Sequence, residues 1–112
     1  MPTLRFFRKI LDAQSVINTV SGELFPNDLA SVSELAFYIV FGAGTSAGAI
    51  QIESSPIRGY TGTWAPEGSA VVWSAANKVH KVSIEGVSYC SRARISVGIV
   101  GGTVDVYAIG NG

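Results

Sequence analysis

Charge is scarce in this sequence. Eight basic and eight acidic residues make up 14% of the 112 residues, where soluble domains average about 25%, and the formal net charge is zero. A neutral chain has no overall field that attracts a polyanion, so we expect neither nucleic acid nor a membrane as a partner. Hydrophobic residues make up 47% of the chain. The composition therefore favours a subunit largely covered by neighbours over a free sandwich with a Ser/Thr/Gly-rich exterior.

Metal-binding and redox-active side chains are also nearly missing. The one cysteine, Cys90, has no partner for an internal disulfide, so the fold is not expected to depend on an oxidising compartment. The one histidine, His80, is flanked by Lys78 and Lys81 and is interpreted as a strand residue on a solvated face. Since a metal site usually needs about three or four ligands, we expect no metal, no cofactor and no catalytic residues. A serine triad through His80 and Asp105 has no support in the spacing.

Long apolar runs are missing as well. No run approaches the ~20 residues that a membrane-spanning helix needs. Near the amino terminus, Arg5, Arg8 and Lys9 interrupt the apolar residues before the apolar region of a signal peptide forms. We therefore expect a chain that is made and assembled in the cytoplasm.

Glycine is plentiful, and its 13 residues divide the chain into short segments with a period of two, as in half-buried strands. Residues 89–99 alternate most clearly, with Ala93, Ile95, Val97 and Ile99 expected on the core face. Gly101-Gly102 is typical of a two-residue hairpin turn. Residues 103–109 are therefore predicted to pair back on that strand.

Other segments follow the same pattern. Residues 34–41 are apolar on both faces, which predicts a central strand or one covered by a partner. The loop 42–48 is expected to make a hairpin with the strand 49–54. Residues 55–68 are predicted to be a loop anchored by Trp64, and short strands are predicted at 70–74 and 78–84. Residues 4–12 fit a strand or a short helix, and 16–25 a strand.

These segments predict an all-β protein. We expect one antiparallel β-sandwich domain over residues 1–112, jelly-roll-like, with about seven or eight short strands. The alternative that residues 1–12 form an extended amino-terminal arm stays open.

Three local features invite a chemical interpretation. Gly44-Thr45-Ser46-Ala47-Gly48 matches the G-x-S-x-G elbow of hydrolases, but that elbow needs a helix after the turn, and the residues that follow alternate as a strand. Arg92 and Arg94 share one strand face and suit either carboxylate or phosphate recognition or cross-strand pairing with Glu53 or Asp105. Five of the aromatic residues suit either core packing or a sugar-stacking platform. They are Tyr38, Tyr60, Trp64, Trp73 and Tyr107.

The order of the segments carries a family resemblance. It runs through Leu11-Asp12-Ala13, the central strand 35–41, residues 50–55, a turn from Gly59 to Thr63-Trp64, residues 91–96 and the closing segment 101–106. This order resembles small β-sandwich virion proteins of tailed bacteriophages, a group that includes capsid cement (decoration) proteins and small head or tail accessory subunits. Ser54, Gly59 and Trp64 match the serine, glycine and tryptophan of the turn in such relatives.

The resemblance implies a non-catalytic subunit on the capsid exterior that stiffens the shell. Its partners would be copies of itself, with a trimer favoured, and the major capsid protein or another virion protein. The candidate interaction residues are Phe6, Phe7, Arg8, Tyr38, Arg58, Tyr60, Trp64, Arg92 and Arg94. Two alternatives stay open: a receptor- or carbohydrate-binding module of a tail or fibre, with Tyr60, Trp64 and Trp73 in a groove, and a small hydrolase using Ser46.

Overall fold

The computed structural model describes residues 4–24, 34–75, 78–85 and 90–111. Within these ranges the chain forms eight strands and no helix, which confirms the predicted all-β fold. The strands are β1 (Leu4–Gln14), β2 (Glu34–Phe41), β3 (Ala47–Ser55), β4 (Ala65–Pro66), β5 (Val71–Val72), β6 (Val79–Glu85), β7 (Cys90–Val100) and β8 (Val104–Asn111).

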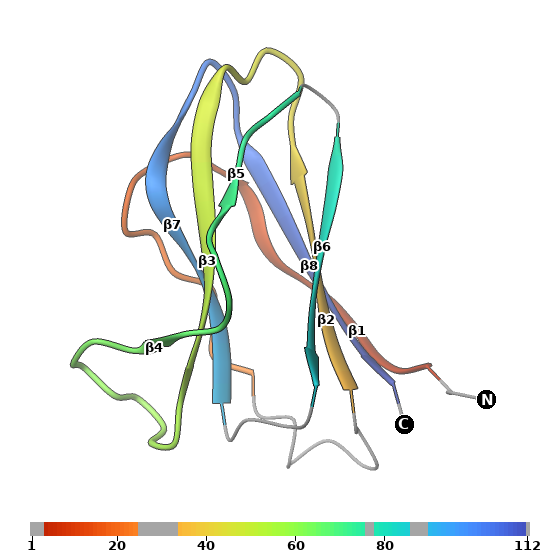
Figure 1. The fold of residues 1–112 in the computed structure, drawn as a ribbon, viewed down its shortest axis with the longest axis vertical. Helices are drawn as coiled ribbons and strands as arrows, with labels where there is room; N and C mark the ends of the chain where they lie inside the picture. The colour runs from red at the N-terminus through yellow and green to blue at the C-terminus, as the bar shows by residue number, and fades with distance from the viewer. Residues whose placement is uncertain (1–3, 25–33, 76–77, 86–89, 112) are drawn as a thin grey trace.

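The strands form two antiparallel sheets (Figure 1). One has the order β1-β8-β2-β6 and is called here the β8 sheet. In the other, called the β3 sheet, β3 pairs with β4, β5 and β7. The two sheets pack face to face, because side chains from β2 and β8 share one buried cluster with side chains from β3 and β7. The fold is thus a β-sandwich.

The core follows the alternation of the sequence. The β2 side chains Phe37, Ile39 and Phe41 point inward and are fully buried. The same cluster includes Val106, which lies opposite Ile39 on the neighbouring strand β8, and Ile50 from β3 of the facing sheet. Burying one such side chain contributes about 1.5–3 kcal/mol. The inward face of β2 therefore anchors both sheets.

Both predicted hairpins are wrong. The glycine-rich segments 42–46 and 101–103 each join strands of different sheets, because β2 pairs with β6 and β8, whereas β3 pairs with β7. Likewise β8 pairs with β1 and β2 and not with β7. A hairpin and a crossing between sheets place the same apolar alternation around the same kind of turn. The local pattern therefore does not distinguish them.

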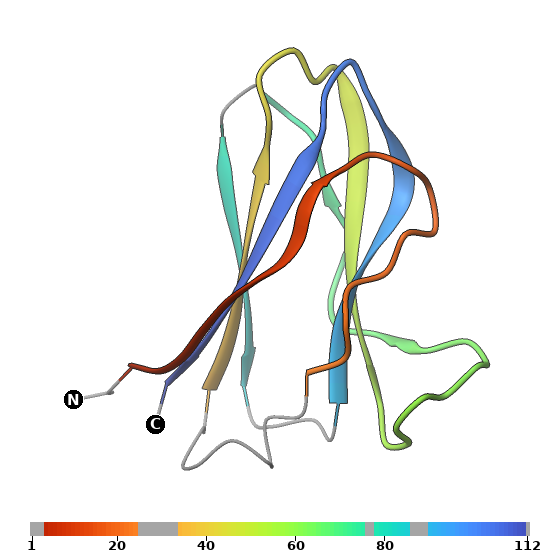
Figure 2. The same cartoon turned by 180° about the vertical axis from the view of Figure 1, so that it is seen from behind.

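The two crossings pack on each other at one end of the sandwich (Figures 1 and 2). The Gly42 amide donates a hydrogen bond of 2.8 Å to the Thr103 carbonyl. Gly44 and Gly101 have φ angles of 86° and 82°, and a Cβ on Gly101 would lie 2.3 Å from the Gly44 carbonyl oxygen. These two glycines are needed both for their backbone conformation and for the close approach.

Val97 was expected in the core, but its side chain is 52% exposed. In the ladder with β3, Ile50 faces Ile95 and Ala49 faces Val97, so β7 carries an extra residue there, and a second register shift follows. Each extra residue reverses the direction of the next side chain. The first bulge turns Val97 outward, and the second returns Ile99 to the core.

The strand expected at 16–25 is also wrong over the residues described, 16–24. This segment makes only isolated bridges, at Val20 and Leu24, and Asn18 has a positive φ of 67° that breaks the extended run. Residues 15–24 instead lie along the free side of β7 and form six backbone hydrogen bonds with it. We call this segment the strap.

At the amino terminus, the strand alternative for residues 4–12 is the one that forms. β1 pairs with β8 from Leu4↔Asn111 to Gln14↔Val104. The segment 70–74 contains β5, and the segment 78–84 becomes β6. The segment 55–68, predicted to be a loop throughout, contains the short strand β4, which pairs with β3.

Candidate interaction surface

A row of cations and aromatic rings crosses the outer face of the β8 sheet. The register places Lys9 of β1 opposite Tyr107 of β8, Tyr107 opposite Tyr38 of β2, and Tyr38 opposite Lys81 of β6. The Lys9 and Lys81 ammonium groups each lie 5.6 Å from the ring centroid of their aromatic neighbour. Such cation–π contacts contribute about 0.5–1 kcal/mol at exposed sites. Each lysine thus contributes a modest stabilising contact to the tyrosine beside it.

An apolar hollow lies beside this row. Phe7, Tyr38, Tyr107 and Ile109 line it, and it has a volume of about 250 Å³. The Phe7 ring is 60% exposed and lies 5.8 Å from the Tyr107 ring. We call these four residues the aromatic groove. Exposed aromatic side chains around a hollow are characteristic of the central part of protein–protein interfaces.

The cations at the two ends of the row differ in their partners. Lys9 forms ion pairs with Asp12 at 2.9 Å and Asp105 at 3.6 Å. The hydrogen bond to Asp12, with a smaller contribution from the charge of Asp105, outweighs desolvation and raises the pKa of Lys9. Lys81 forms no ion pair with the residues that the structure describes. The β6 side of the groove therefore has a positive charge available for an acidic partner.

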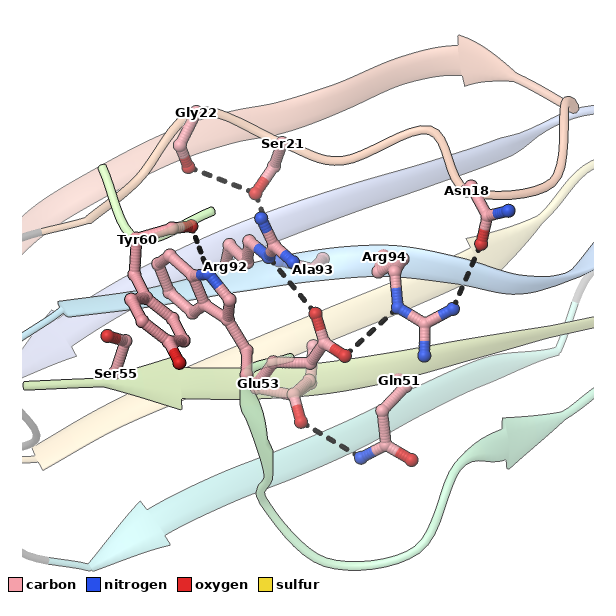
Figure 3. A network of polar contacts seen from close by, with 12 residues as sticks. Asn18, Ser21, Gly22, Gln51, Glu53, Ser55, Tyr60, Arg92, Ala93 and Arg94 are labelled. Atoms are coloured by element: carbon pink, nitrogen blue, oxygen red, sulfur yellow. Dashed lines mark hydrogen bonds and ion pairs between the residues drawn. The ribbon is translucent and has the colours of Figure 1, made fainter. Parts of the chain in front are cut away.

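The outer face of the β3 sheet carries a different feature, a buried carboxylate between two arginines (Figure 3). Glu53 accepts a bond of 3.0 Å from Arg92 Nε and one of 2.9 Å from Arg94 Nε, and its side chain is 5% exposed. Arg94 also donates to Asn18 Oδ1 of the strap. Of the two expected partners of these arginines, Glu53 is therefore the one observed, and the pair is engaged within the chain.

Trp64 completes this polar network. The Arg92 guanidinium lies 4.1 Å from the centroid of the Trp64 ring, and Trp64 Nε1 donates to the Tyr60 carbonyl at 2.8 Å. The Trp64 side chain is buried, which confirms it as the anchor of the loop 55–68. Because Trp64 lies beneath Arg92 and Trp73 packs against the core, these two do not form an exposed platform with Tyr60.

A second pocket lies under this loop. It has a volume of about 280 Å³, and Pro56, Ile57, Tyr60 and Trp64 are among the residues that line it. Tyr60 is 41% exposed at its wall. Gly62 lies against the Tyr60 ring, where a Cβ would come within 2.5 Å of the hydroxyl oxygen.

The nine candidate residues are thus spread over three places. Phe7 and Tyr38 meet in the aromatic groove, and Phe6 and Arg8 lie on β1 close by. The loop 55–68 holds Arg58, Tyr60 and Trp64, and β7 holds Arg92 and Arg94. Sequence reasoning named Tyr107 only as part of a sugar-stacking platform and Lys81 only as a neighbour of His80, and it missed Ile109. For Ile109 the available signal was an apolar residue at an outward position of an alternating strand.

The residues considered for metal binding or catalysis do not line the aromatic groove. Among the described residues, no group of three or more His, Cys, Asp or Glu is placed to hold a metal ion. Ser46 lies in a crossing between sheets and is followed by β3, not by a helix. In the described ranges we also find no helix of the length and hydropathy that crossing a membrane requires.

His80 is not on a solvated face as expected. Its ring packs edge-on against Phe41 at 5.8 Å, and Nε2 is buried without a hydrogen-bond partner among the described residues. Burial, assisted by the charge of Lys78, lowers the pKa of His80 below its usual 6.5. The ladder explains this, since His80 faces inward with Val82 and Ile84 while Lys81 faces outward.

By its fold and surface, the chain is a small antiparallel β-sandwich with an apolar hollow on one outer face. It matches the crystal structure of SPBc2 prophage-derived protein YomS with a TM-score of 0.67 and 15% sequence identity, over 100% of this chain and 96% of that chain. At this identity the match shows a common fold. No family model matches the chain, and no curated protein matches it significantly. The fold is therefore one that a prophage-derived protein also has.

Proposed function

We propose that this chain is a non-enzymatic structural subunit of a tailed-bacteriophage virion, of the capsid cement type, that binds a capsid protein through the aromatic groove. The observation that carries the proposal is the groove itself: the exposed Phe7 and the half-buried Tyr38, Tyr107 and Ile109 line one apolar hollow on a chain that is short of charge. The common fold with a prophage-derived protein supports it.

The geometry fits docking better than catalysis. The groove lies on the outer face of a four-stranded sheet, and Lys9 and Lys81 each contact one of its tyrosine rings before any partner arrives. A preorganised apolar surface loses little side-chain freedom on binding. The expected partner surface inserts an apolar side chain between Phe7 and Tyr38 and places a carboxylate near Lys81.

Localisation on the particle tests this function. Virions produced by the phage or prophage that encodes this chain are purified, their proteins are identified by mass spectrometry, and the chain is located with gold-labelled antibody. Label over the head shell is the expected result. Heads that lack the chain should also release DNA at a lower temperature than complete heads. Absence of the chain from purified virions would contradict the proposal.

The pocket under the loop 55–68 favours a second candidate, a receptor- or carbohydrate-binding module of a tail or fibre. Its wall includes the half-exposed Tyr60 ring, and aromatic rings stack on sugars. Gold label at the tail tip, together with glycan binding that Tyr60→Ala abolishes, would favour this function over the cement role.

A further inference from the structure

The β8 sheet ends on one side at β6, which is an open edge. Figure 2 shows the order β6, β2, β8, β1 with β6 at the outer margin. An edge strand has unpaired backbone N–H and C=O groups that can pair with another strand, and proteins usually obstruct such edges. The strand pairings and the backbone hydrogen bonds show which edges of this sandwich are obstructed.

The other edges of the sandwich are obstructed. β1 carries three register shifts against β8, which bend it away from regular pairing. β7 is covered by the strap through six backbone hydrogen bonds. The remaining edge of the β3 sheet consists of β4 and β5, which have two residues each. None of these offers a regular strand to a partner.

β6 differs in each respect. It has seven residues without proline, and it pairs with β2 in unbroken register from Glu34↔Glu85 to Val40↔Val79. Among the described residues, no segment covers its outer side. Its outward lysine, Lys81, extends over the Tyr38 ring of β2, so the ammonium group lies over the sheet and not beyond the edge.

The geometry points to a two-fold contact in which β6 pairs antiparallel with β6 of a second copy, so that two β8 sheets join into one. This contact goes beyond the proposed function, since it joins two copies of the chain and not the chain and a capsid protein; Lys81 is the residue that the two proposals share. It would also join two aromatic grooves on one continuous face. A symmetric strand pair is a common form of self-association, because a two-fold axis makes one patch complementary to itself.

The charge pattern of β6 selects a register. With Ser83 on the two-fold axis, Lys81 lies opposite Glu85 of the second copy, and Val82 lies opposite Ile84. Opposite charges and aliphatic pairs stabilise antiparallel neighbours, whereas like charges directly opposite destabilise them. Centring the contact on Lys81 would place two lysines together. The Ser83 register is therefore the favoured one.

Two exposed-site variants test the contact on the full chain. In this register the two Ser83 Cα atoms lie roughly 4.5–5.5 Å apart, within the range that a disulfide spans. Ser83→Cys should therefore give a covalent dimer under mild oxidation. Ala43→Cys, an exposed position in the β2–β3 crossing, is the matched control and should form no covalent dimer under the same conditions. Wild type, with Cys90 buried, gives the background.

Sedimentation equilibrium gives the second readout. Wild type should show a concentration-dependent dimer. Ser83→Lys places like charges on the axis and should raise the dissociation constant of this dimer at least about tenfold, whereas Ser83→Thr should leave it unchanged. A wild-type chain that stays monomeric up to about millimolar concentration would overturn the inference. So would a trimer that Ser83→Lys leaves unchanged. Both outcomes leave the capsid-binding proposal to be decided separately.

Discussion

Glu53 is the residue on which the outer layer of the β3 sheet most depends. Its carboxylate is almost fully buried and accepts hydrogen bonds from two arginines, one of which lies against Trp64. Removing one member of a buried ion group leaves the other charges without compensation. The loop 55–68 and the strap are both tied to this group, so its loss should be felt beyond the residue itself.

We expect Glu53→Gln to lower the free energy of unfolding by about 2–3 kcal/mol, because the amide keeps the shape but not the charge. Urea denaturation measures the change. Glu67→Gln is the control, since Glu67 accepts a single bond from Ser54 Oγ and a glutamine oxygen can replace it; its effect should stay below about 1 kcal/mol. Equal effects of the two substitutions would show that the arginine pair does not matter.

His80 should make stability depend on pH. Because burial lowers the pKa of His80, the unfolded chain binds more protons than the folded one between the folded-state pKa and 6.5. Stability is therefore complete above 6.5 and falls as the pH drops through the folded-state pKa. His80→Phe should remove this part of the pH dependence, as seen in urea midpoints at a series of pH values from neutral to mildly acidic.

Lys78→Ala is the matched variant for His80. It removes the lesser cause of the lowered pKa while leaving burial, so the loss of stability should persist with a smaller amplitude. A wild-type profile identical to that of His80→Phe would show that the histidine does not titrate differently on folding.

At the scale of elements, the two crossings between sheets depend on the contact of Gly44 with Gly101. We expect Gly101→Ala to destabilise the fold by more than Gly68→Ala. Both glycines have positive φ, but a Cβ meets the Gly44 carbonyl at the first and nothing within 4 Å at the second. The backbone conformation alone accounts for about 1–2 kcal/mol. Thermal unfolding of both variants isolates the close approach, and equal shifts in Tm would contradict it.

The alternation that predicts the elements does not predict how they pair. β2, β6, β7 and β8 fall near their expected ranges because side-chain burial repeats every second residue. The partners of these strands were wrong wherever a glycine turn joined them, since pairing is decided by contacts far apart in sequence. The strap was missed for a similar reason, as its backbone bonds go to β7 and its own residues alternate only weakly.

The candidate site was predictable in part. Phe7 and Tyr38 were singled out as candidates, and the register of β1, β8 and β2 brings them together with Tyr107 and Ile109. Trp64, Arg92 and Arg94 were also candidates, but they contact one another and Glu53. Composition alone does not distinguish an exposed ring from a ring covered by a guanidinium group.

For the whole molecule, the scarcity of charge agrees with a surface divided by function. One outer face carries the polar network of Glu53 and the loop above it, and the other carries the aromatic groove. A chain with few charges can present an apolar face in a particle where a partner covers it. We therefore expect the aromatic groove, and not the opposite face, to bind the capsid.

Binding of the purified chain to heads that lack it shows whether the aromatic groove makes this contact. Phe7→Ser removes an exposed ring of the groove, and Val72→Ser removes an equally exposed apolar side chain on β5 of the opposite sheet, at 60% and 62% exposure. Titration of both variants against such heads should show Phe7→Ser weakened about tenfold or more and Val72→Ser close to wild type. Equal binding by wild type and Phe7→Ser would contradict the claim.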